Sequence, residues 1–319
     1  MQEVYNIIMN ILYCGDQGIA RGVLVSILSL LINGTKKYHP HRGGMIKPTE
    51  VGPPTYNIYI MTVHYPGVKP FKPQTTAFLN SLVKKYNPRS SVQLIDATAA
   101  FKSHPPDKNM GTYFTPCAML RLYINLVPEF ANIDKLLYLD YDIVCRGDIR
   151  PLYHLDISSR EAAGVLDIYG RRWYKYHGLL KQPKDAKDWL DPQDRSRSFL
   201  KQDYMNSGVM LFNLAKCRQT KMLDKARALC ASKKMLLPDQ GALNRAITHR
   251  LLLPRKFNEQ EERPRPDTIL HHFSNNFKFW PYFRVQKVKP FETAKIHKIL
   301  HIHEYDDILK EYQQLKGHL

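Results

Sequence analysis

Two carboxylates, Asp140 and Asp142, follow a continuous apolar run at 136–139. Such a run is typical of a strand that is buried on both faces in a parallel sheet. Unpaired carboxylates are costly there, so either the strand has ended and the acids face water, or the pair is held at the strand end for a purpose. If the backbone turns between them, both can bind one hard divalent cation, which would also accept phosphate oxygens.

The elements around this pair predict an α/β fold. Strands are expected at 6–14, 57–63, 91–97, 135–144, 162–168 and 208–214, and helices at 22–32, 75–87, 117–130, 217–231, 238–249 and 303–317. Because strands and helices alternate through the first half, we expect an open, mostly parallel sheet flanked by helices.

Polar residues close three of the expected strands. Gly15 and Asp16 follow the first strand, the D-x-D closes the fourth, and Asp167 closes the fifth. In an open α/β sheet, ligands bind beyond the carboxyl ends of the strands. This convergence favours a binding site over a pair of solvent-facing loop acids.

The charge and the cysteines narrow the class of protein. The chain has 319 residues and a formal net charge of +18, which indicates an anionic partner or simply maintains solubility. No nucleic-acid-binding motif accompanies the charge. Five cysteines, without C-x-x-C spacing, indicate reduced intracellular thiols rather than a disulfide framework. We find no signal peptide, and the apolar stretch 22–32 is too short to span a bilayer.

Motifs along the chain resemble those of the family 8 glycosyltransferases, the retaining enzymes related to glycogenin and to bacterial lipooligosaccharide galactosyltransferases. KLLYLDYDIVCRGDIRPLYHLDI resembles the metal-binding segment, and NSGVMLFNL matches N-[SA]-G-V-x-L-x-N-L. LPDQGALN matches D-Q-x-x-x-N, LPRKFN resembles L-P-x-x-[YFW]-N, and HFSNNFKFW matches H-[FY]-x-G-x-x-K-P-W at its His, Lys and Trp. The motifs keep the family's order from about residue 6 to residue 281.

The resemblance implies a role for each matching residue. Asp140, Asp142 and His272 would bind the metal, Mn²⁺ with Mg²⁺ as a weaker substitute, together with the donor's diphosphate. Gln240 would be catalytic under the anomeric carbon, with Asp239 beside it near the sugar hydroxyls. The residues implied to bind the nucleotide sugar are Cys14, Gly15, Asp16, Arg121, Asp140, Tyr141, Asp167, Asn206, Ser207, Gly208 and Lys278.

Several assignments leave alternatives open. Asn275 stands where the family usually has Gly, and a side chain there would crowd the diphosphate loop. His271 neighbours His272, and the spacing to Lys278 selects His272 as the ligand. Arg121 lies on an expected helix, where it either contacts the donor or is an ordinary exposed arginine.

The implied function is metal-dependent transfer of glucose or galactose from a UDP-sugar to a hydroxyl of a glycan, lipid-linked saccharide or glycoprotein. The anomeric configuration would be retained, because a neutral amide, Gln240, is a poor nucleophile and base, which leaves the departing diphosphate as the base. The alternative is a non-catalytic module on the same fold that binds an anionic polymer or membrane.

The resemblance implies a GT-A-type catalytic domain at 1–281, in which 1–145 binds the nucleotide and 146–281 faces sugar and acceptor. A basic, partly helical extension is expected at 282–319. The acceptor would contact the loops 34–55 and 169–201, where the resemblance stops. We expect a cytoplasmic protein whose basic, aromatic stretch 278–298 contacts the inner face of an anionic membrane.

Overall fold

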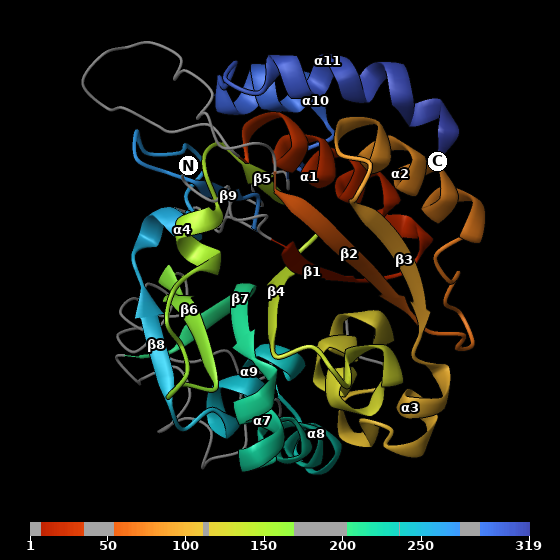
Figure 1. Ribbon diagram of the computed structural model, residues 1–319, viewed down its shortest axis with the longest axis vertical. Coiled ribbons are helices and arrows are strands. Elements are labelled where there is room, and N and C mark those ends of the chain that lie inside the picture. The colour runs from red at the N-terminus through yellow and green to blue at the C-terminus, as the bar shows by residue number, and fades with distance from the viewer. Residues whose placement is uncertain (1–7, 35–53, 111–114, 169–202, 236, 275–287) are drawn as a thin grey trace, which may run out of the picture.

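The structure, a computed structural model, describes residues 8–34, 54–110, 115–168, 203–235, 237–274 and 288–319. Its centre is a seven-stranded sheet of order β3-β2-β1-β4-β7-β6-β8 (Figure 1). The strands are β1 (Ile8–Cys14), β2 (Thr55–Thr62), β3 (Ser91–Asp96), β4 (Lys135–Leu139), β6 (Ala162–Leu166), β7 (Met205–Asn213) and β8 (Arg250–Leu253). The open, mostly parallel α/β sheet expected from the sequence is confirmed.

Strand β7 runs opposite to the rest of the sheet. It is antiparallel to β4 and β6, whereas the other neighbouring pairs are parallel. Leu139 at the end of β4 therefore pairs with Val209 in the middle of β7, and Asp140 follows beside the first residues of β7. This reversal brings the D-x-D that leaves β4 beside the NSG segment that enters β7.

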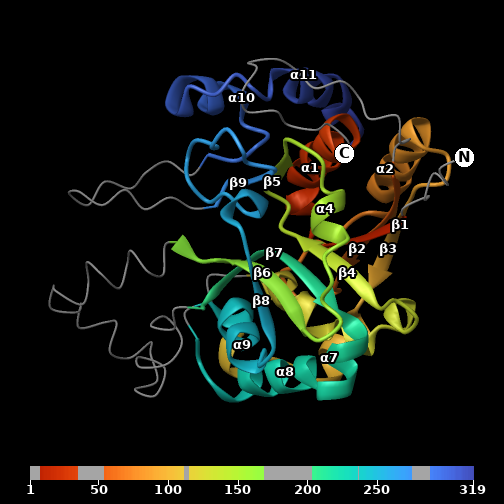
Figure 2. The same cartoon turned by 60° about the vertical axis from the view of Figure 1, so that its left-hand side comes forward.

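Helices cover both faces of the sheet (Figures 1 and 2). One face packs against α1 (Ala20–Asn33) and α2 (Pro73–Tyr86), and α11 (Asp306–Leu315) lies over α1. The opposite face packs against a 3₁₀-helical run at Pro116–Leu126 and against α8 (Met222–Ser232) and α9 (Pro238–Ala246). The shorter helices are α3 (Thr98–Ser103), α4 (Arg150–Tyr153), α7 (Leu214–Thr220), α10 (Thr293–Lys295) and the π-helical turn Ile296–Leu300.

The expected strand 135–144 is wrong as a single element. Strand β4 ends at Leu139, and the next strand, β5 (Ile143–Cys145), leaves the sheet to pair with β9 (Leu270–His272). The Asp140 amide still donates to the Gly208 carbonyl at 2.8 Å, after which the chain turns. The turn falls between the two carboxylates, as shared binding of one cation requires.

Two expected helices also differ. The region 217–231 forms two helices, α7 and α8, because Lys221 between them adopts a left-handed conformation with φ of 54°. The expected helix at 117–130 is instead the 3₁₀ run, which ends at Leu126, ahead of Pro128. A proline lacks the amide that would continue the helical hydrogen bonds.

Three further expectations concern the cysteines, membrane-spanning helices and the C-terminal extension. All five cysteines are buried free thiols, as expected. Among the described residues, no helix combines the length and apolar character needed to cross a membrane. The described part of the expected C-terminal extension is helical but packs on α1 and shares its core, with Ile296 and Ile308 buried. The division of the chain near residue 281 stays a prediction.

Candidate active site

The structure brings the three predicted metal ligands together. One ligand atom from each of Asp140, Asp142 and His272 lies within 4.8 Å of the other two. The β5–β9 pairing sets His272 opposite Ile143, directly after the D-x-D turn. His272 Nε2 lies 3.3 Å from Asp142 Oδ1 and 3.7 Å from Asp140 Oδ2. We call these three residues the Asp–His cluster.

Hydrogen bonds fix which nitrogen of His272 faces the carboxylates. Its Nδ1 lies 3.1 Å from Asn258 Oδ1, and the Asn258 amide nitrogen donates to Asn206 Oδ1 at 2.9 Å. Because the Asn258 oxygen can only accept, Nδ1 donates to it, and Nε2 is the nitrogen that faces the carboxylates. This is the arrangement that orients a metal-binding histidine. The donor set, two carboxylates and one imidazole, fits a divalent cation such as Mn²⁺.

Gly208 leaves the space that the cluster needs. A Cβ at this position would lie 2.2 Å from His272 Cε1 and 3.0 Å from Asp140 Oδ2. Any other residue would displace the imidazole or the carboxylate. The requirement for glycine is therefore steric and comes from close approach rather than from backbone conformation.

Arg121 is buried and bridges the carboxylates of Asp140 and Asp239. The alternative that Arg121 is an ordinary exposed arginine is therefore wrong. Its Nη2 donates to Asp140 Oδ1 at 3.0 Å, and its Nε pairs with Asp239 Oδ2 at 3.1 Å. Its Nη1 donates to the Ser207 carbonyl at 2.6 Å. With one Asp140 oxygen held in this way, the other faces His272. Burial raises the pKa of the Asp239 carboxyl, which Arg121 opposes and the Asp140 charge reinforces.

Gln240 is oriented through both ends of its amide. Its oxygen accepts from the Ser207 amide at 2.9 Å and the Ser207 hydroxyl at 3.2 Å. The Gln240 nitrogen donates to Asp167 Oδ2 at 3.0 Å. Asp167 Oδ2 also accepts a hydrogen bond from Asn206 Nδ2 at 3.1 Å. Hydrogen bonds thus connect Gln240 to the Asp–His cluster along two routes, one through Asn206 and one through Ser207.

Sequence reasoning missed two residues of the site. Asn258 lies in the quoted LPRKFN segment, so its motif was visible although its role was not. Lys289 had no motif, yet its Nζ lies 2.5 Å from Asp142 Oδ2 and 5.1 Å from the Tyr141 ring centroid. Burial alone would raise the pKa of Asp142, but Lys289 and His272 outweigh it and hold that pKa well below its ordinary value.

The remaining predicted residues lie at the end of β1, in the D-x-D turn or outside the described residues. Cys14 is buried at the end of the strand, and the Gly15 amide donates to the Met61 carbonyl at 3.0 Å. Asp16 is partly exposed and accepts from the Gly18 amide at 2.9 Å, which caps a short 3₁₀ turn. Tyr141 packs close to Gly22. Lys278 and Asn275, which departs from the motif, lie outside the described residues.

His271 has a different environment from His272. Its Nε2 donates to the Glu261 carbonyl at 2.8 Å, so its Nδ1 accepts from the Tyr305 hydroxyl at 2.7 Å. Burial lowers the pKa of His271 to about 3. Both nitrogens are occupied within the core, so His271 has no lone pair left for a ligand.

The comparisons with known proteins identify the family. The sequence model of glycosyl transferase family 8 matches residues 10–283, so the chain belongs to that family. The open α/β fold is shared with two solved structures. LgtC, a galactosyltransferase crystallised with donor and acceptor sugar analogues, superposes with a TM-score of 0.60 at 16% identity, over 98% of this chain and 96% of that one. WbbM, a bifunctional glycosyltransferase, superposes with a TM-score of 0.65 at 17% identity, over 97% of this chain and 52% of that one.

A curated relative is more similar in sequence. The lipopolysaccharide 1,2-glucosyltransferase of Escherichia coli is 28% identical over 262 residues, which cover 73% of this chain and 71% of that protein. The family assignment and these relatives make the chain a glycosyltransferase by class.

Proposed function

We propose that this protein transfers glucose or galactose from a UDP-sugar to a hydroxyl of a lipopolysaccharide-type glycan and retains the anomeric configuration. Membership of glycosyl transferase family 8 supports transfer as the reaction. The name of the Escherichia coli relative supports glucose as the sugar and lipopolysaccharide as the acceptor class. The galactosyltransferase LgtC supports the fold alone.

The observation that carries the proposal is the convergence of the Asp–His cluster at the carboxyl edge of the sheet. A divalent cation there, Mn²⁺ with Mg²⁺ as a weaker substitute, supplies charge to neutralise the donor's diphosphate as it leaves. In this proposal Asp140, Asp142 and His272 hold the ion. Arg121 keeps Asp140 turned toward it, and Asn258 keeps the His272 lone pair available.

Lys289 supplies a second positive charge beside the same diphosphate. Its ammonium group already contacts Asp142, within reach of any group bound at the cluster. A point charge placed in advance where negative charge develops lowers the barrier to departure of the leaving group. Lys278 keeps its predicted diphosphate role as an expectation.

Gln240 is proposed to face the anomeric carbon. Its amide is neutral and is held at both ends, so it can stabilise positive charge with its dipole but neither attacks nor takes a proton. Asp239 cannot act as a free base, because Arg121 pairs with it. The departing diphosphate is then the base for the acceptor hydroxyl, and attack from the leaving-group face retains the configuration.

A UDP-release assay tests the donor and the reaction class together. The protein is incubated with UDP-glucose, UDP-galactose or UDP-N-acetylglucosamine, with Mn²⁺ and without acceptor. We expect slow, Mn²⁺-dependent UDP release from one of the two hexose donors. Donor binding without any release would instead favour the non-catalytic module. With a lipopolysaccharide core acceptor, a large β-type coupling of the product's anomeric proton would contradict retention.

Contact with an anionic membrane and a cytoplasmic location stay predictions. The net charge of +18 supports them, because clustered basic residues bind anionic lipid surfaces. Most of the stretch 278–298 on which the membrane prediction depends lies outside the described residues, as do most of the proposed acceptor loops.

A further inference from the structure

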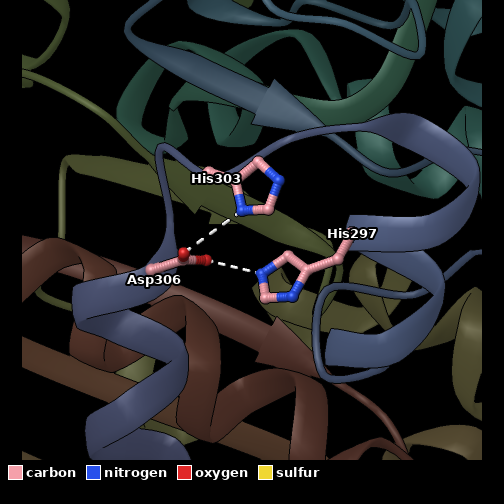
Figure 3. A group of neighbouring side chains, drawn as sticks. All are labelled: His297, His303 and Asp306. Atoms are coloured by element: carbon pink, nitrogen blue, oxygen red, sulfur yellow. Dashed lines mark hydrogen bonds and ion pairs between the residues drawn. The ribbon is translucent and has the colours of Figure 1, made fainter.

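A second group of side chains that could bind a metal lies in the C-terminal segment of the chain, apart from the Asp–His cluster. It consists of His297, His303 and Asp306, which we call the His–Asp turn. His297 Nε2 lies 2.6 Å from Asp306 Oδ1, and His303 Nδ1 lies 3.4 Å from Asp306 Oδ2. Figure 3 shows each ring turning one nitrogen toward the carboxylate. The two imidazole rings stack, with 4.6 Å between their centroids.

The backbone of this turn is fixed by its buried face. The π-helical turn ends at Leu300, and the next residue, His301, has a φ of 53° that reverses the chain before α11 begins at Asp306. Leu300, Ile302 and Tyr305 are buried in the core that includes α1. Packing of these three buried residues fixes the backbone of the turn, and the fixed backbone pre-organises the three polar side chains that it carries.

The three side chains are open to water. The exposed fractions are 32% for His297, 67% for His303 and 49% for Asp306. An ion can reach them without any opening of the core. One ligand atom from each lies within 4.8 Å of the others, so small rotations of the side chains suffice to bring all three onto one ion.

The donor set selects a different class of ion from that of the Asp–His cluster. Two imidazoles and one carboxylate, with water as the fourth ligand, suit zinc and similar transition metals. Oxygen-rich sets suit Mn²⁺ and Mg²⁺ instead. We propose that His297, His303 and Asp306 form a second metal site, which takes a divalent transition metal such as Zn²⁺ and fastens the C-terminal turn to the start of α11.

The competing explanation is a hydrogen-bonded helix start. A carboxylate in the first turn of a helix is favourable by itself, and two histidines can bond to it without any metal. The two explanations differ in one measurable respect, because only the metal site gives zinc affinity that depends on all three side chains.

The test is a Zn²⁺ titration of the untagged full chain by calorimetry, with Co²⁺ absorption as the spectroscopic readout. We expect the wild type to show a class of Zn²⁺ sites whose affinity falls at least about tenfold in His297→Ala and in Asp306→Asn. Asp142→Asn should leave this class intact. His154→Ala, a control at an exposed histidine that follows α4, should change nothing.

Stability provides a second readout. Zinc at about 100 times its dissociation constant should raise the Tm of the wild type by about 5 °C, because the ion binds only the folded chain. In the Asp142→Asn background, which removes the contribution of the Asp–His cluster, the shift should persist and should disappear when His303→Ala is added, the change at the most exposed of the three side chains. Zinc binding and a Tm shift that survive substitution of the His–Asp turn in this background, or no zinc binding by the wild type, would overturn the proposal.

Discussion

The Asp–His cluster and the His–Asp turn use the same kinds of side chains in opposite settings. The first is assembled from distant segments and is enclosed by Arg121, Asn258 and Lys289. The second comes from one short segment and lies at the surface. A buried cluster of charges requires partners for every ligand, whereas an exposed one relies on water. We therefore expect substitutions around the first cluster to affect stability and activity, and substitutions in the second to affect metal binding and only the stability that bound metal adds.

The largest effect is expected from Arg121→Met. The change leaves the buried Asp239 and the half-buried Asp140 without their shared counter-ion, so the free energy of unfolding should fall by about 3–5 kcal/mol and turnover should be lost. Urea unfolding measures the first quantity. Arg218→Met, at an exposed pair with Asp134, is the control and should cost less than about 1 kcal/mol. Equal losses in the two variants would mean that burial of the network does not matter.

Gly208→Ala should reduce turnover without unfolding the chain. The new methyl group must push His272 or Asp140 out of place, and a displacement of about 1 Å costs about 10²-fold in rate. UDP-release rates with increasing Mn²⁺ measure the effect. Gly164→Ala is the matched control in the same sheet, because its Cβ would lie 3.1 Å from the flexible Met205 sulfur and at ordinary contact distances of 3.5 and 3.6 Å from its next neighbours. Wild-type rates in Gly208→Ala would place the reacting groups elsewhere.

His271 should make the free energy of unfolding depend on pH. Its pKa is about 3 in the folded chain and 6.5 when unfolded, so the unfolded state binds the extra proton between these values. Stability is then lost as the pH falls below 6.5, by about 2 kcal/mol at pH 5. His271→Gln can keep both hydrogen bonds and should flatten this part of the stability curve. An unchanged slope would show that His271 is already protonated in the native state.

Lys289→Met should have a smaller effect, on the metal affinity. The ammonium group contacts the carboxylate that the metal needs, so its removal should tighten Mn²⁺ binding in the absence of UDP. The expected gain is about tenfold, which corresponds to about 1.4 kcal/mol. Electron paramagnetic resonance of free Mn²⁺ measures it. Lys295→Met, at the surface pair with Glu292, should leave the affinity unchanged. Weaker Mn²⁺ binding in Lys289→Met would mean that the lysine supports the metal rather than competing with it.

The sheet and most site residues could be predicted because they depend on local signals. Apolar periodicity placed the strands of the parallel half, and motif order placed Asp140, Gly208, Gln240 and His272. The break after Leu139 could not be predicted, since β5 is defined by its partner β9 more than a hundred residues away. Lys289 could not be predicted for the same reason, because no sequence pattern near it indicates its contact with Asp142.

The central claim is that the Asp–His cluster, and not the His–Asp turn, holds the metal required for transfer. The most direct test compares Mn²⁺-dependent UDP release from the preferred UDP-hexose by the wild type, Asp142→Asn and His297→Ala. We predict that Asp142→Asn loses about 10³-fold in rate, comparable with removal of a principal electrostatic contact, and that His297→Ala keeps the wild-type rate. Release that persists in Asp142→Asn, or that needs no divalent ion in the wild type, would contradict the account.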